Sequence, residues 1–322
     1  MTEQNSLAPL TVVIPTYNRR EVLRRTLYGY LAQSSPHLVS ELLIVDDGST
    51  DDTESVVSEF WRVAPFPIRY LHQPNRGPAA ARNLGLTEAA TQLVLYTDDD
   101  VIPHPELVLQ HVRWHRQDPA PSVAVLGFVT WAPEVHATPF MRWYGEGGSL
   151  FGYRQFRHRR EIDYRSFYTC NLSVKREFLQ AFGKFDERFK IAAYEDIELG
   201  FRLSKAGLRL LYNPQAIGYH YQFFTFGDAC RKKKKAAPAR QLFLQTEAGK
   251  HLLEIQRQRD SRFIFRVARW MITWFGRLFE SAPKLLDSNF PLPGFIYRSL
   301  LWFHAGRTYD VRELGEENLS HS

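Results

Sequence analysis

Four short apolar runs alternate with segments of helical periodicity over the first hundred residues of the chain. The runs cover residues 10–14, 41–45, 68–71 and 93–96, and each is followed by proline, glycine or acidic residues that favour a turn. Between them, apolar residues recur at steps of three and four, which is typical of helices. Because strands of this kind separated by helices build a sheet covered on both faces, the sequence predicts an α/β fold with a mostly parallel central sheet flanked by helices.

The composition suits an ordered globular protein of this size. The chain has 322 residues, of which 44% are hydrophobic and 24% charged, so it can bury a core without help from metals or disulfides. It has two cysteines, Cys170 and Cys230, and neither a disulfide framework nor a zinc site is predicted. The N-terminal residues lack the pattern of a signal peptide, and no apolar run reaches the roughly 18 residues of a membrane span. A cytoplasmic location is therefore expected.

Three of the four predicted strands end in dense polar segments. These are PTYN at 15–18, DDGS at 46–49 and DDD at 98–100. In open α/β sheets ligands bind beyond the carboxyl ends of the parallel strands, so the three segments are expected to share one edge. Each segment alone is also ordinary turn chemistry, because aspartate is common in turns and helix caps.

Together these segments place at least four carboxylates at one rim, where repulsion is relieved by a cation. Mg²⁺ or Mn²⁺ is the expected cofactor, because these ions take hard oxygen ligands and fill their remaining positions with water and substrate phosphates. The ligand is then expected to be phosphorylated. The glycine-rich motifs of dehydrogenase dinucleotide sites and of P-loops are both missing after the first strand, which argues against those two classes.

Five segments in this order resemble the inverting family 2 glycosyltransferases of the GT-A fold: VVIPTYNR (12–19), IVDDGSTDDT (44–53), NRGPAAARNLG (75–85), YTDDD (96–100) and YEDIELGFRL (194–203). The resemblance covers about residues 8–222. It implies transfer of a sugar from a nucleotide diphosphate sugar, expected to be UDP-linked, to the hydroxyl of a saccharide acceptor in polysaccharide or glycoconjugate synthesis. It also implies a catalytic domain over 1–222, with a nucleotide-sugar half at 1–103 and an acceptor half at 104–222, and a basic, mainly helical extension over 223–322.

The resemblance assigns a set of residues to the donor site. These are Pro15, Thr16, Tyr17, Arg19, Asp46, Asp47 and Arg82. Asp47 is expected to accept a hydrogen bond from the nucleotide base, with Asp46 beside it. Two roles remain open for Arg82: a contact near the nucleotide and the metal-binding carboxylates, or a structural ion pair that holds the aspartate loop.

The family binds its metal through an Asp-any-Asp motif, and the alignment of this motif selects among the three aspartates. Aligning the aspartates that precede Val101 puts Thr97 at the first position of the motif, Asp98 in the middle and Asp99 at the last position. Asp99 is then the expected metal ligand, and Asp98 is expected to contact the ribose or the metal in place of Thr97. Asp100 is expected to turn back and cap the segment that follows.

The second half of the resemblance supplies the chemistry. Glu195 and Asp196 stand at the start of a predicted helix, where acidic residues often only complement the helix dipole. In the family the matching acidic residue is the general base, so Asp196 is expected to take the proton of the acceptor hydroxyl, with Glu195 as a substrate contact. Asn171 is expected to line the sugar or acceptor pocket. His220 is either a further metal ligand or a structural histidine.

The predicted strand and helix alternation stops near residue 223, and positive charge gathers beyond it. RKKKK at 231–235, like RHRR at 157–160, indicates either an anionic partner or a solvated surface. The sequence predicts that RKKKK lies in a connector. Residues 264–278 predict a cationic amphipathic helix, which either lies in an anionic membrane surface or packs on the protein or on a second copy in a homo-oligomer. The first alternative suggests a lipid-linked saccharide acceptor and a peripheral position at the inner face of the cell membrane.

Three other functions fit the sequence less well. A sugar nucleotidyltransferase normally carries a glycine-rich loop with a basic residue after the first strand, which PTYNRR at 15–20 lacks. A degenerate nucleotide-sugar sensor or scaffold would have no use for a base such as Asp196. Nucleic acid is not an expected partner, because no recognisable binding fold accompanies the basic run.

Overall fold

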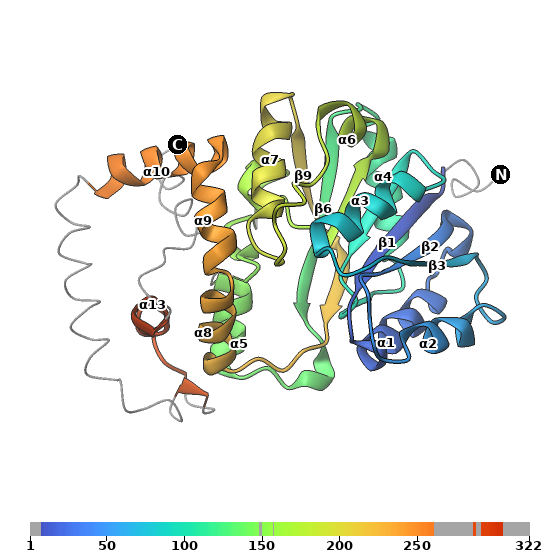
Figure 1. Cartoon of the computed structure of the whole chain (residues 1–322), viewed down its shortest axis with the longest axis horizontal. Helices are drawn as coiled ribbons and strands as arrows, with labels where there is room; N and C mark the ends of the chain where they lie inside the picture. The colour runs from blue at the N-terminus through green and yellow to red at the C-terminus, as the bar shows by residue number, and fades with distance from the viewer. Residues whose placement is uncertain (1–7, 148–149, 157, 261–285, 288–290, 305–322) are drawn as a thin grey trace. The chain divides into compact units, whose positions relative to one another are not determined.

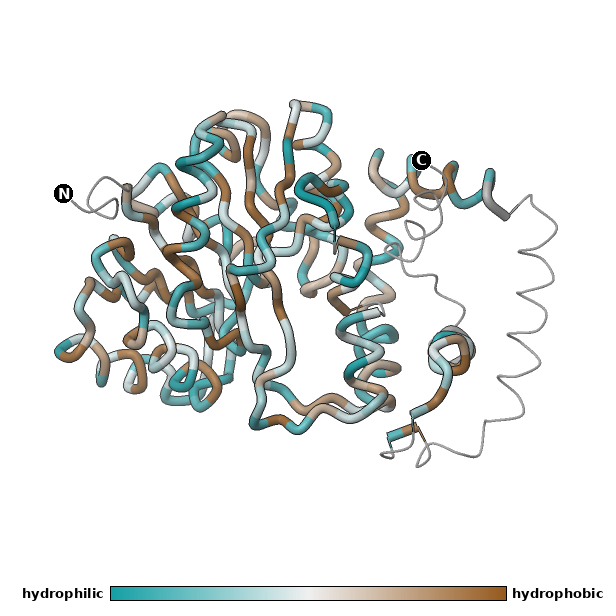
Figure 2. Tube along the Cα trace, turned by 180° about the vertical axis from the view of Figure 1, so that it is seen from behind, coloured by the Kyte–Doolittle hydropathy of each residue, from teal (hydrophilic) through white to brown (hydrophobic). Residues whose placement is uncertain are grey.

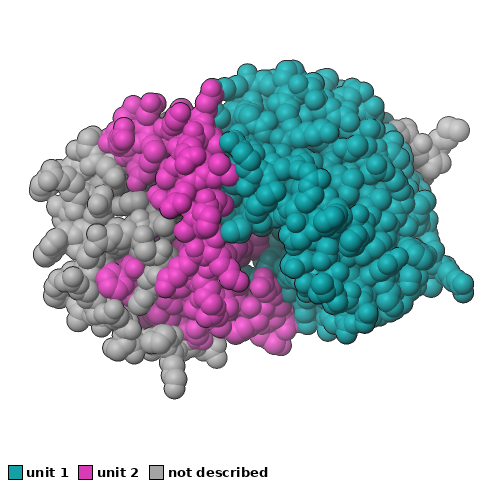
Figure 3. All heavy atoms as spheres, viewed as in Figure 1, with its two compact units in different colours: residues 1–132, 158–221 teal, residues 133–157, 222–322 magenta. Residues whose placement is uncertain are grey.

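A computed structural model of the chain describes residues 8–147, 150–156, 158–260, 286–287 and 291–304 (Figure 1). The chain divides into two compact units, coloured separately in Figure 3. Unit 1 comprises residues 1–132 and 158–221, and unit 2 comprises residues 133–157 and 222–322. The functional halves expected from the sequence, at 1–103 and 104–222, stay predictions.

Unit 1 is built on a nine-stranded sheet with the order β3-β2-β1-β4-β8-β6-β9-β5, in which β7 also pairs with β9. The strands are β1 Leu10–Thr16, β2 Val39–Asp46, β3 Ile68–His72, β4 Leu93–Thr97, β5 Val101–Pro103, β6 Val123–Trp131, β7 Glu161–Ile162, β8 Asn171–Lys175 and β9 Arg209–His220. The helices are α1 Arg20–Leu31, α2 Thr53–Phe60, α3 Pro78–Glu88, α4 Leu107–Gln117, α6 Arg176–Phe182 and α7 Glu195–Lys205. All four strands predicted from the first hundred residues are present, so the predicted α/β fold is confirmed.

The sheet changes character halfway across. The strands β3, β2, β1 and β4 are parallel neighbours, as predicted. Beyond them β8 runs antiparallel to both β4 and β6, and β9 runs parallel to β6 but antiparallel to β5 and β7. The prediction of a mostly parallel sheet therefore holds for the first half only, because hydrophobic periodicity shows where strands lie but not which strands pair.

Both faces of β1, β2 and β4 are buried, which explains their mostly apolar character, whereas the edge strand β3 is only half-buried. On one face, side chains of α1, α2 and α4 form a single hydrophobic cluster with alternate residues of β1, β2 and β4. On the other face lies α3, where Gly85 approaches so closely that an added Cβ would be 2.3 Å from Val13 Cγ1. The strands accordingly appear as hydrophobic segments within the tube of Figure 2.

Unit 2 is helical in its described residues. It contains α5 Pro139–Arg142, α8 Phe226–Lys235, α9 Ala237–Gln245, α10 Glu247–Asp260 and α13 Gly294–His304, with short turns at Pro133–Val135, Trp143–Gly147 and Tyr153–Phe156. An aromatic cluster holds it together, with the ring of Phe140 5.4–5.5 Å from those of Tyr144, Phe226 and Tyr297.

The basic run at 231–235 is not a connector, as the sequence had suggested, but the end of α8. This helix begins with a capping box between Thr225 and Asp228, and the lysines at its carboxyl end complement the helix dipole. The predicted amphipathic helix at 264–278 lies outside the described residues. In the part of the chain that is described, no helix is long and apolar enough to cross a membrane.

Candidate functional site

The carboxyl ends of the parallel strands carry the candidate site. In the register of β1 and β2, Thr16 lies opposite Asp46, and β1 also pairs in parallel with β4, which ends at Thr97. The segments at 15–18, 46–49 and 98–100 therefore follow neighbouring strands at one edge of the sheet, as predicted.

Asp46 and Asp47 close the loops beside β2. Asp46 accepts hydrogen bonds from the Ser49 amide at 2.8 Å and from the Tyr70 hydroxyl. Asp47 is 5% exposed. Its carboxylate accepts hydrogen bonds from Gln73 Nε2 at 2.6 Å and from the backbone amides of Arg76 and Gly77, each at 2.8 Å. Both carboxylates thus hold the segment 70–77 against β2, and their contacts with a nucleotide stay predictions.

The turn after β1 presents Tyr17 to solvent. Asn18 has a φ of 54°, which asparagine tolerates better than most residues. Its side-chain oxygen accepts a hydrogen bond from the Thr50 backbone amide at 2.7 Å, and its backbone amide donates to Ser49 Oγ at 2.8 Å. The Tyr17 side chain is left 47% exposed, which suits stacking on a planar ligand. Sequence reasoning missed Asn18, although asparagine directly after a strand is a recognised turn signal; Pro15 itself lies in β1 opposite Val45.

Asp99 points into the protein and is fully engaged there. It is 4% exposed, its Oδ2 accepts from Thr16 Oγ1 at 2.8 Å, and its Oδ1 pairs with Arg19 Nη1 at 2.9 Å. Its backbone oxygen accepts from Thr26 Oγ1 at 2.7 Å. Burial raises the pKa of Asp99 to about 7, although the charge of Arg19 acts in the opposite direction.

Asp98 and Asp100 make different contacts from Asp99. The side chain of Asp98 is 37% exposed, and its Oδ1 lies 3.5 Å from Arg82 Nη2. Burial nevertheless raises the pKa of Asp98. Oδ2 of Asp100 lies 2.7 Å from Arg19 Nη2 and 3.5 Å from His220 Nε2. Asp100, to which the sequence had assigned only a capping role, is therefore the aspartate whose carboxylate meets His220.

His220 is placed by three strands. It is the last residue of β9, opposite Val101 of β5 on one side and Trp131 of β6 on the other. The rings of His220 and Trp131 meet edge to face at 5.2 Å. A histidine and a carboxylate are thereby brought together from segments 120 residues apart in the sequence.

The start of α7 carries the two acidic residues of the second half. Tyr194, just before the helix, has a φ of 71°, a conformation that costs a non-glycine residue about 1–2 kcal/mol. The Asp196 carboxylate accepts from the Thr169 amide at 3.1 Å and from Thr169 Oγ1 at 3.0 Å, and its side chain is 16% exposed. Glu195 is 2% exposed, and burial together with the charge of Asp196 raises its pKa to about 7. Of the two, Asp196 is the one that solvent reaches.

Arg82 of α3 joins the two acidic groups. Its Nη1 lies 2.9 Å from Glu195 Oε1 and 3.9 Å from Asp196 Oδ1, while its Nη2 is the group near Asp98. The guanidinium is buried and lies over the ring of Phe185, 5.6 Å from its centre. Burial lowers the pKa of Arg82, but the three carboxylates outweigh it and hold the pKa above its usual value. The ion pair expected as one of its two roles is present.

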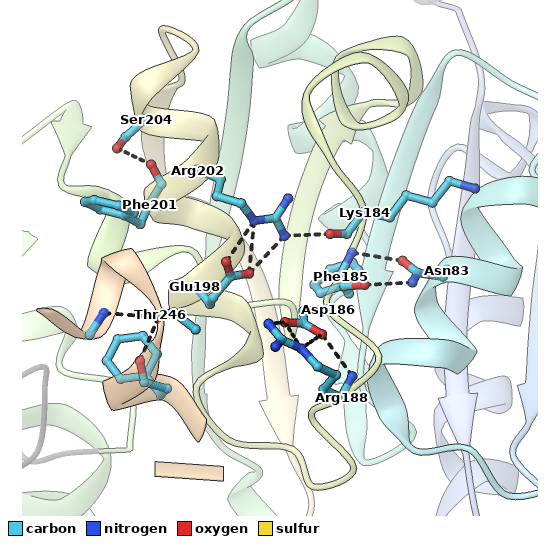
Figure 4. Close-up of polar contacts among 12 residues, drawn as sticks. Asn83, Lys184, Phe185, Asp186, Arg188, Glu198, Phe201, Arg202, Ser204 and Thr246 are labelled. Carbon is cyan, nitrogen blue, oxygen red and sulfur yellow. Dashed lines mark hydrogen bonds and ion pairs between the residues drawn. The ribbon is translucent and has the colours of Figure 1, made fainter. Parts of the chain in front are cut away.

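The loop before α7 is tied to both neighbouring helices (Figure 4). Asn83 of α3 donates from Nδ2 to the Phe185 oxygen at 2.9 Å and accepts from the Phe185 amide at 3.0 Å. Arg202 of α7 pairs with Glu198 one turn earlier at 2.8 Å and donates to the Lys184 oxygen at 2.6 Å. These contacts hold the amino end of α7 against α3 and so keep the base candidate beside Arg82.

Asn171 is occupied inside the sheet. Its side chain is fully buried, its Oδ1 lies 2.8 Å from His111 Nε2, and its Nδ2 donates to the backbone oxygens of Phe128 at 3.2 Å and Ala216 at 2.8 Å. These contacts brace β8, β6 and β9 against one another and involve every polar group of the amide. The predicted contact of Asn171 with a sugar stays a prediction, and His111 was not singled out from the sequence.

The chemistry of this edge suits a divalent cation that shares its coordination with a ligand. Within the described residues, no group of three or more His, Cys, Asp and Glu side chains forms a complete metal cage. Mg²⁺ and Mn²⁺ are commonly held by only one or two protein ligands when phosphates supply the rest. The Asp100 oxygen and the His220 nitrogen, 3.5 Å apart, could hold such an ion, and the charges of both residues act on the pKa of Asp98.

Comparison with known proteins finds a family and a fold that this chain resembles. Residues 11–182 match the sequence model of the family described as glycosyl transferase family 2. A validoxylamine A glucosyltransferase of Streptomyces hygroscopicus subsp. jinggangensis is 33% identical over 65% of this chain and 54% of its own length. A second such enzyme, from S. hygroscopicus subsp. limoneus, is matched over 51% of its length, so the chain spans about half of these relatives.

Among solved structures, the fold is shared with a mannosyltransferase from Pyrobaculum calidifontis determined in complex with GDP-Man and Mn²⁺. The match has a TM-score of 0.52 and 18% identity, and it covers 98% of this chain and 75% of the other. S. aureus TarS 1-349 in complex with UDP matches with a TM-score of 0.54 and 17% identity over 92% of this chain and 89% of the other.

Proposed function

The chain belongs to glycosyl transferase family 2, and from this we propose that it transfers a sugar from a nucleotide diphosphate sugar to an acceptor hydroxyl with inversion at the anomeric carbon. The observation that carries the proposal is the position of Arg82, which contacts Asp98 of the aspartate run on one side and Glu195 and Asp196 on the other. Donor-binding carboxylates and a base are thereby separated by a single guanidinium. An inverting transfer needs such a pair, because the base and the leaving diphosphate act on opposite sides of the sugar carbon.

Asp98, Asp100 and His220 are the proposed holders of the divalent cation. The sequence favoured Asp99, whose two oxygens have partners in Thr16 and Arg19. One oxygen of Asp100 also pairs with Arg19, but that oxygen lies 3.5 Å from His220 Nε2. Asp100, which approaches His220, takes its place in the proposal. When bound, Mg²⁺ or Mn²⁺ neutralises the negative charge that gathers on the departing diphosphate.

The donor is proposed to be UDP-linked, with its nucleotide between Tyr17 and the segment that Asp47 holds. The exposed ring of Tyr17 supports this placement of the base, since aromatic rings stack on nucleobases. The complex of TarS with UDP supports a uridine nucleotide, whereas the GDP-Man complex of the mannosyltransferase shows that the same fold also accepts a guanosine nucleotide.

Asp196 is proposed as the general base. Its carboxylate is held by Thr169, retains contact with solvent and lies within reach of Arg82. The bond from Thr169 Oγ1 fixes the orientation of the carboxylate, and the acceptor hydroxyl would give its proton to this group as it attacks the sugar. Glu195, which is buried against Arg82, would position the arginine.

The acceptor is proposed to be a saccharide, or a lipid-linked saccharide at an anionic membrane surface on the inner face of the cell membrane. Exposed basic side chains at the end of α8 support the second form, since Lys232, Lys234 and Lys235 are all exposed. Co-sedimentation of the full-length protein with vesicles of anionic phospholipid tests it. Activity on a soluble acceptor without any binding to these vesicles would contradict a membrane-bound acceptor, and a homo-oligomer would appear in the same samples by light scattering.

The donor and the metal are tested together. Nucleotide sugars are screened for hydrolysis with and without Mn²⁺, using the wild type, Asp100→Asn, Asp99→Asn and, as a control for the loss of a carboxylate, Asp52→Asn on the exposed surface. We expect Asp100→Asn to lose the dependence on Mn²⁺ and Asp52→Asn to retain it. If Asp99→Asn loses the dependence on Mn²⁺ and Asp100→Asn keeps it, Asp99 is the metal ligand, as expected from the sequence. No turnover of any nucleotide sugar would contradict the proposed activity.

A further inference from the structure

Arg19 occupies the same carboxylate oxygen that His220 approaches. It is the N-cap residue of α1 and follows the turn after β1. Its guanidinium spans two carboxylates, with Nη1 2.9 Å from Asp99 Oδ1 and Nη2 2.7 Å from Asp100 Oδ2. His220 Nε2 lies 3.5 Å from that same Asp100 oxygen. The oxygen best placed to share a cation with His220 is therefore already paired with an arginine.

A guanidinium and a divalent cation compete for such an oxygen. Both are positive, and in a partly buried site, where water screens charges poorly, they repel one another strongly at separations of a few ångströms. Binding of a cation between Asp100 and His220 must displace the Nη2 group of Arg19 or lose affinity to it. The second contact of Arg19, with Asp99, is anchored by Thr16 and need not break.

The guanidinium of Arg19 would have an alternative partner if a cation displaced it from Asp100. The side chain of Arg19 is 37% exposed, whereas those of Asp99 and Asp100 are each 5% exposed, so the arginine is more accessible to solvent than either carboxylate. A nucleotide diphosphate that enters the site would bring oxygens that a guanidinium binds well, because its planar fork matches phosphate geometry.

We propose that Arg19 competes with the divalent cation for the Asp100 carboxylate. Its Nη2 group pairs with Asp100 in the absence of cation and donor, and pairs instead with the donor diphosphate when both bind. The inference rests on the proposed function, since it takes the metal and the diphosphate from there. Its consequence is that the cation alone binds weakly, and that cation and nucleotide each raise the affinity of the site for the other, as thermodynamic linkage requires.

The test is a calorimetric titration of the full-length protein with Mn²⁺ alone, and again in the presence of UDP. The variants are Arg19→Gln, Arg19→Lys and the matched control Arg20→Gln. Arg20 is the adjacent arginine, carries the same charge, is 41% exposed and pairs with Asp52 at 2.7 Å, so its loss changes the net charge without touching the aspartate run. Thermal melting of each variant establishes that it is folded.

We expect Arg19→Gln to bind Mn²⁺ alone about tenfold more tightly than the wild type, because close charge pairs couple at least that strongly. The gain in Mn²⁺ affinity produced by UDP should shrink in the same variant. Arg19→Lys keeps the charge without the planar fork and should fall between the two, and Arg20→Gln should match the wild type.

Unchanged or weaker Mn²⁺ binding by folded Arg19→Gln would overturn the inference, and so would an equal gain in Arg20→Gln, which would make the effect one of net charge. These outcomes leave the proposed function standing, because the wild type still binds the cation. If Mn²⁺ binds to none of the proteins, with or without UDP, the metal site of the proposed function fails as well.

Discussion

Two buried histidines of α4, His111 and His115, should each oppose folding in acid. His111 is fully buried and His115 is 6% exposed, and both contact Ser173 of β8, from Nδ1 of His111 at 2.8 Å and from Nε2 of His115 at 2.9 Å. His111 Nε2 also lies 2.8 Å from Asn171 Oδ1, and His115 Nδ1 lies 3.3 Å from the Lys175 ammonium.

The hydrogen bonds of this group run in one direction. Because Asn171 Nδ2 donates to two backbone carbonyls, its Oδ1 must accept the proton on His111 Nε2. Nδ1 of His111 then accepts from the Ser173 hydroxyl, and Ser173 in turn accepts from His115 Nε2. Lys175 donates to the remaining nitrogen of His115. Each histidine is therefore held neutral, with one nitrogen donating and the other accepting.

The size of the effect follows from the pKa values. Burial lowers the pKa of His111 to about 4 and that of His115 to about 3, against an ordinary value of 6.5. The histidines take up protons more readily in the unfolded chain than in the folded one. Their contribution to the free energy of unfolding is therefore fully present above pH 6.5 and falls as the pH drops towards 4. At pH 5, about 1.5 pH units below the ordinary value, each histidine costs about 2 kcal/mol. Asp99 and Glu195, whose pKa values are raised to about 7, act in the opposite direction between pH 7.5 and pH 5, so the contribution of the histidines is isolated by comparing variants.

Urea denaturation at pH 7.5 and at pH 5 measures how the free energy of unfolding changes between the two pH values. In His115→Gln the amide can still donate to Ser173 and accept from Lys175 but cannot be protonated, so the loss between the two pH values should shrink by about 2 kcal/mol. The control is His72→Gln at the exposed end of β3, which should leave the loss unchanged. An equal loss of stability in His115→Gln and in the wild type would refute the reasoning.

The remaining predictions concern the base and the packing of β6. Asp196→Asn should retain the dissociation constant of the donor, measured by calorimetry, while the transfer rate falls by about 10²–10⁴-fold, because only the proton acceptor is lost; a variant that transfers sugar at the wild-type rate would exclude Asp196 as the base. Gly127→Ala should lower the urea midpoint by an amount equivalent to about 1–3 kcal/mol, because the new Cβ would lie 2.2 Å from Asn171 Nδ2 and 2.5 Å from the Ala216 oxygen. Gly227→Ala in α8, where the nearest atom would be 3.4 Å away, should change the midpoint little, and similar losses in the two variants would show that crowding is not the cause.

Local features of the chain were sufficient to predict the elements that build the site. The apolar runs located β1, β2, β3 and β4 to within a few residues, and for β1, β2 and β4 the reason is burial on both faces of the sheet. The start of α7 at Glu195 also follows from nearby residues. The family followed from the same short segments, because each carries its residue types at a characteristic spacing.

Which aspartate does what was decided only by the tertiary structure. The three aspartates lie in the turn between β4 and β5, where successive side chains point in different directions, so a shift of one position changes which partners a carboxylate meets. Asp99 turns to Thr16 and Arg19, whereas Asp100 reaches His220, and no local pattern distinguishes these neighbours. The same holds for Asn171, whose partners come from β6, β9 and α4. The sequence determined where the strands end; the pairing of distant strands determined what each end meets, because contacts between remote segments depend on register and not on local preference.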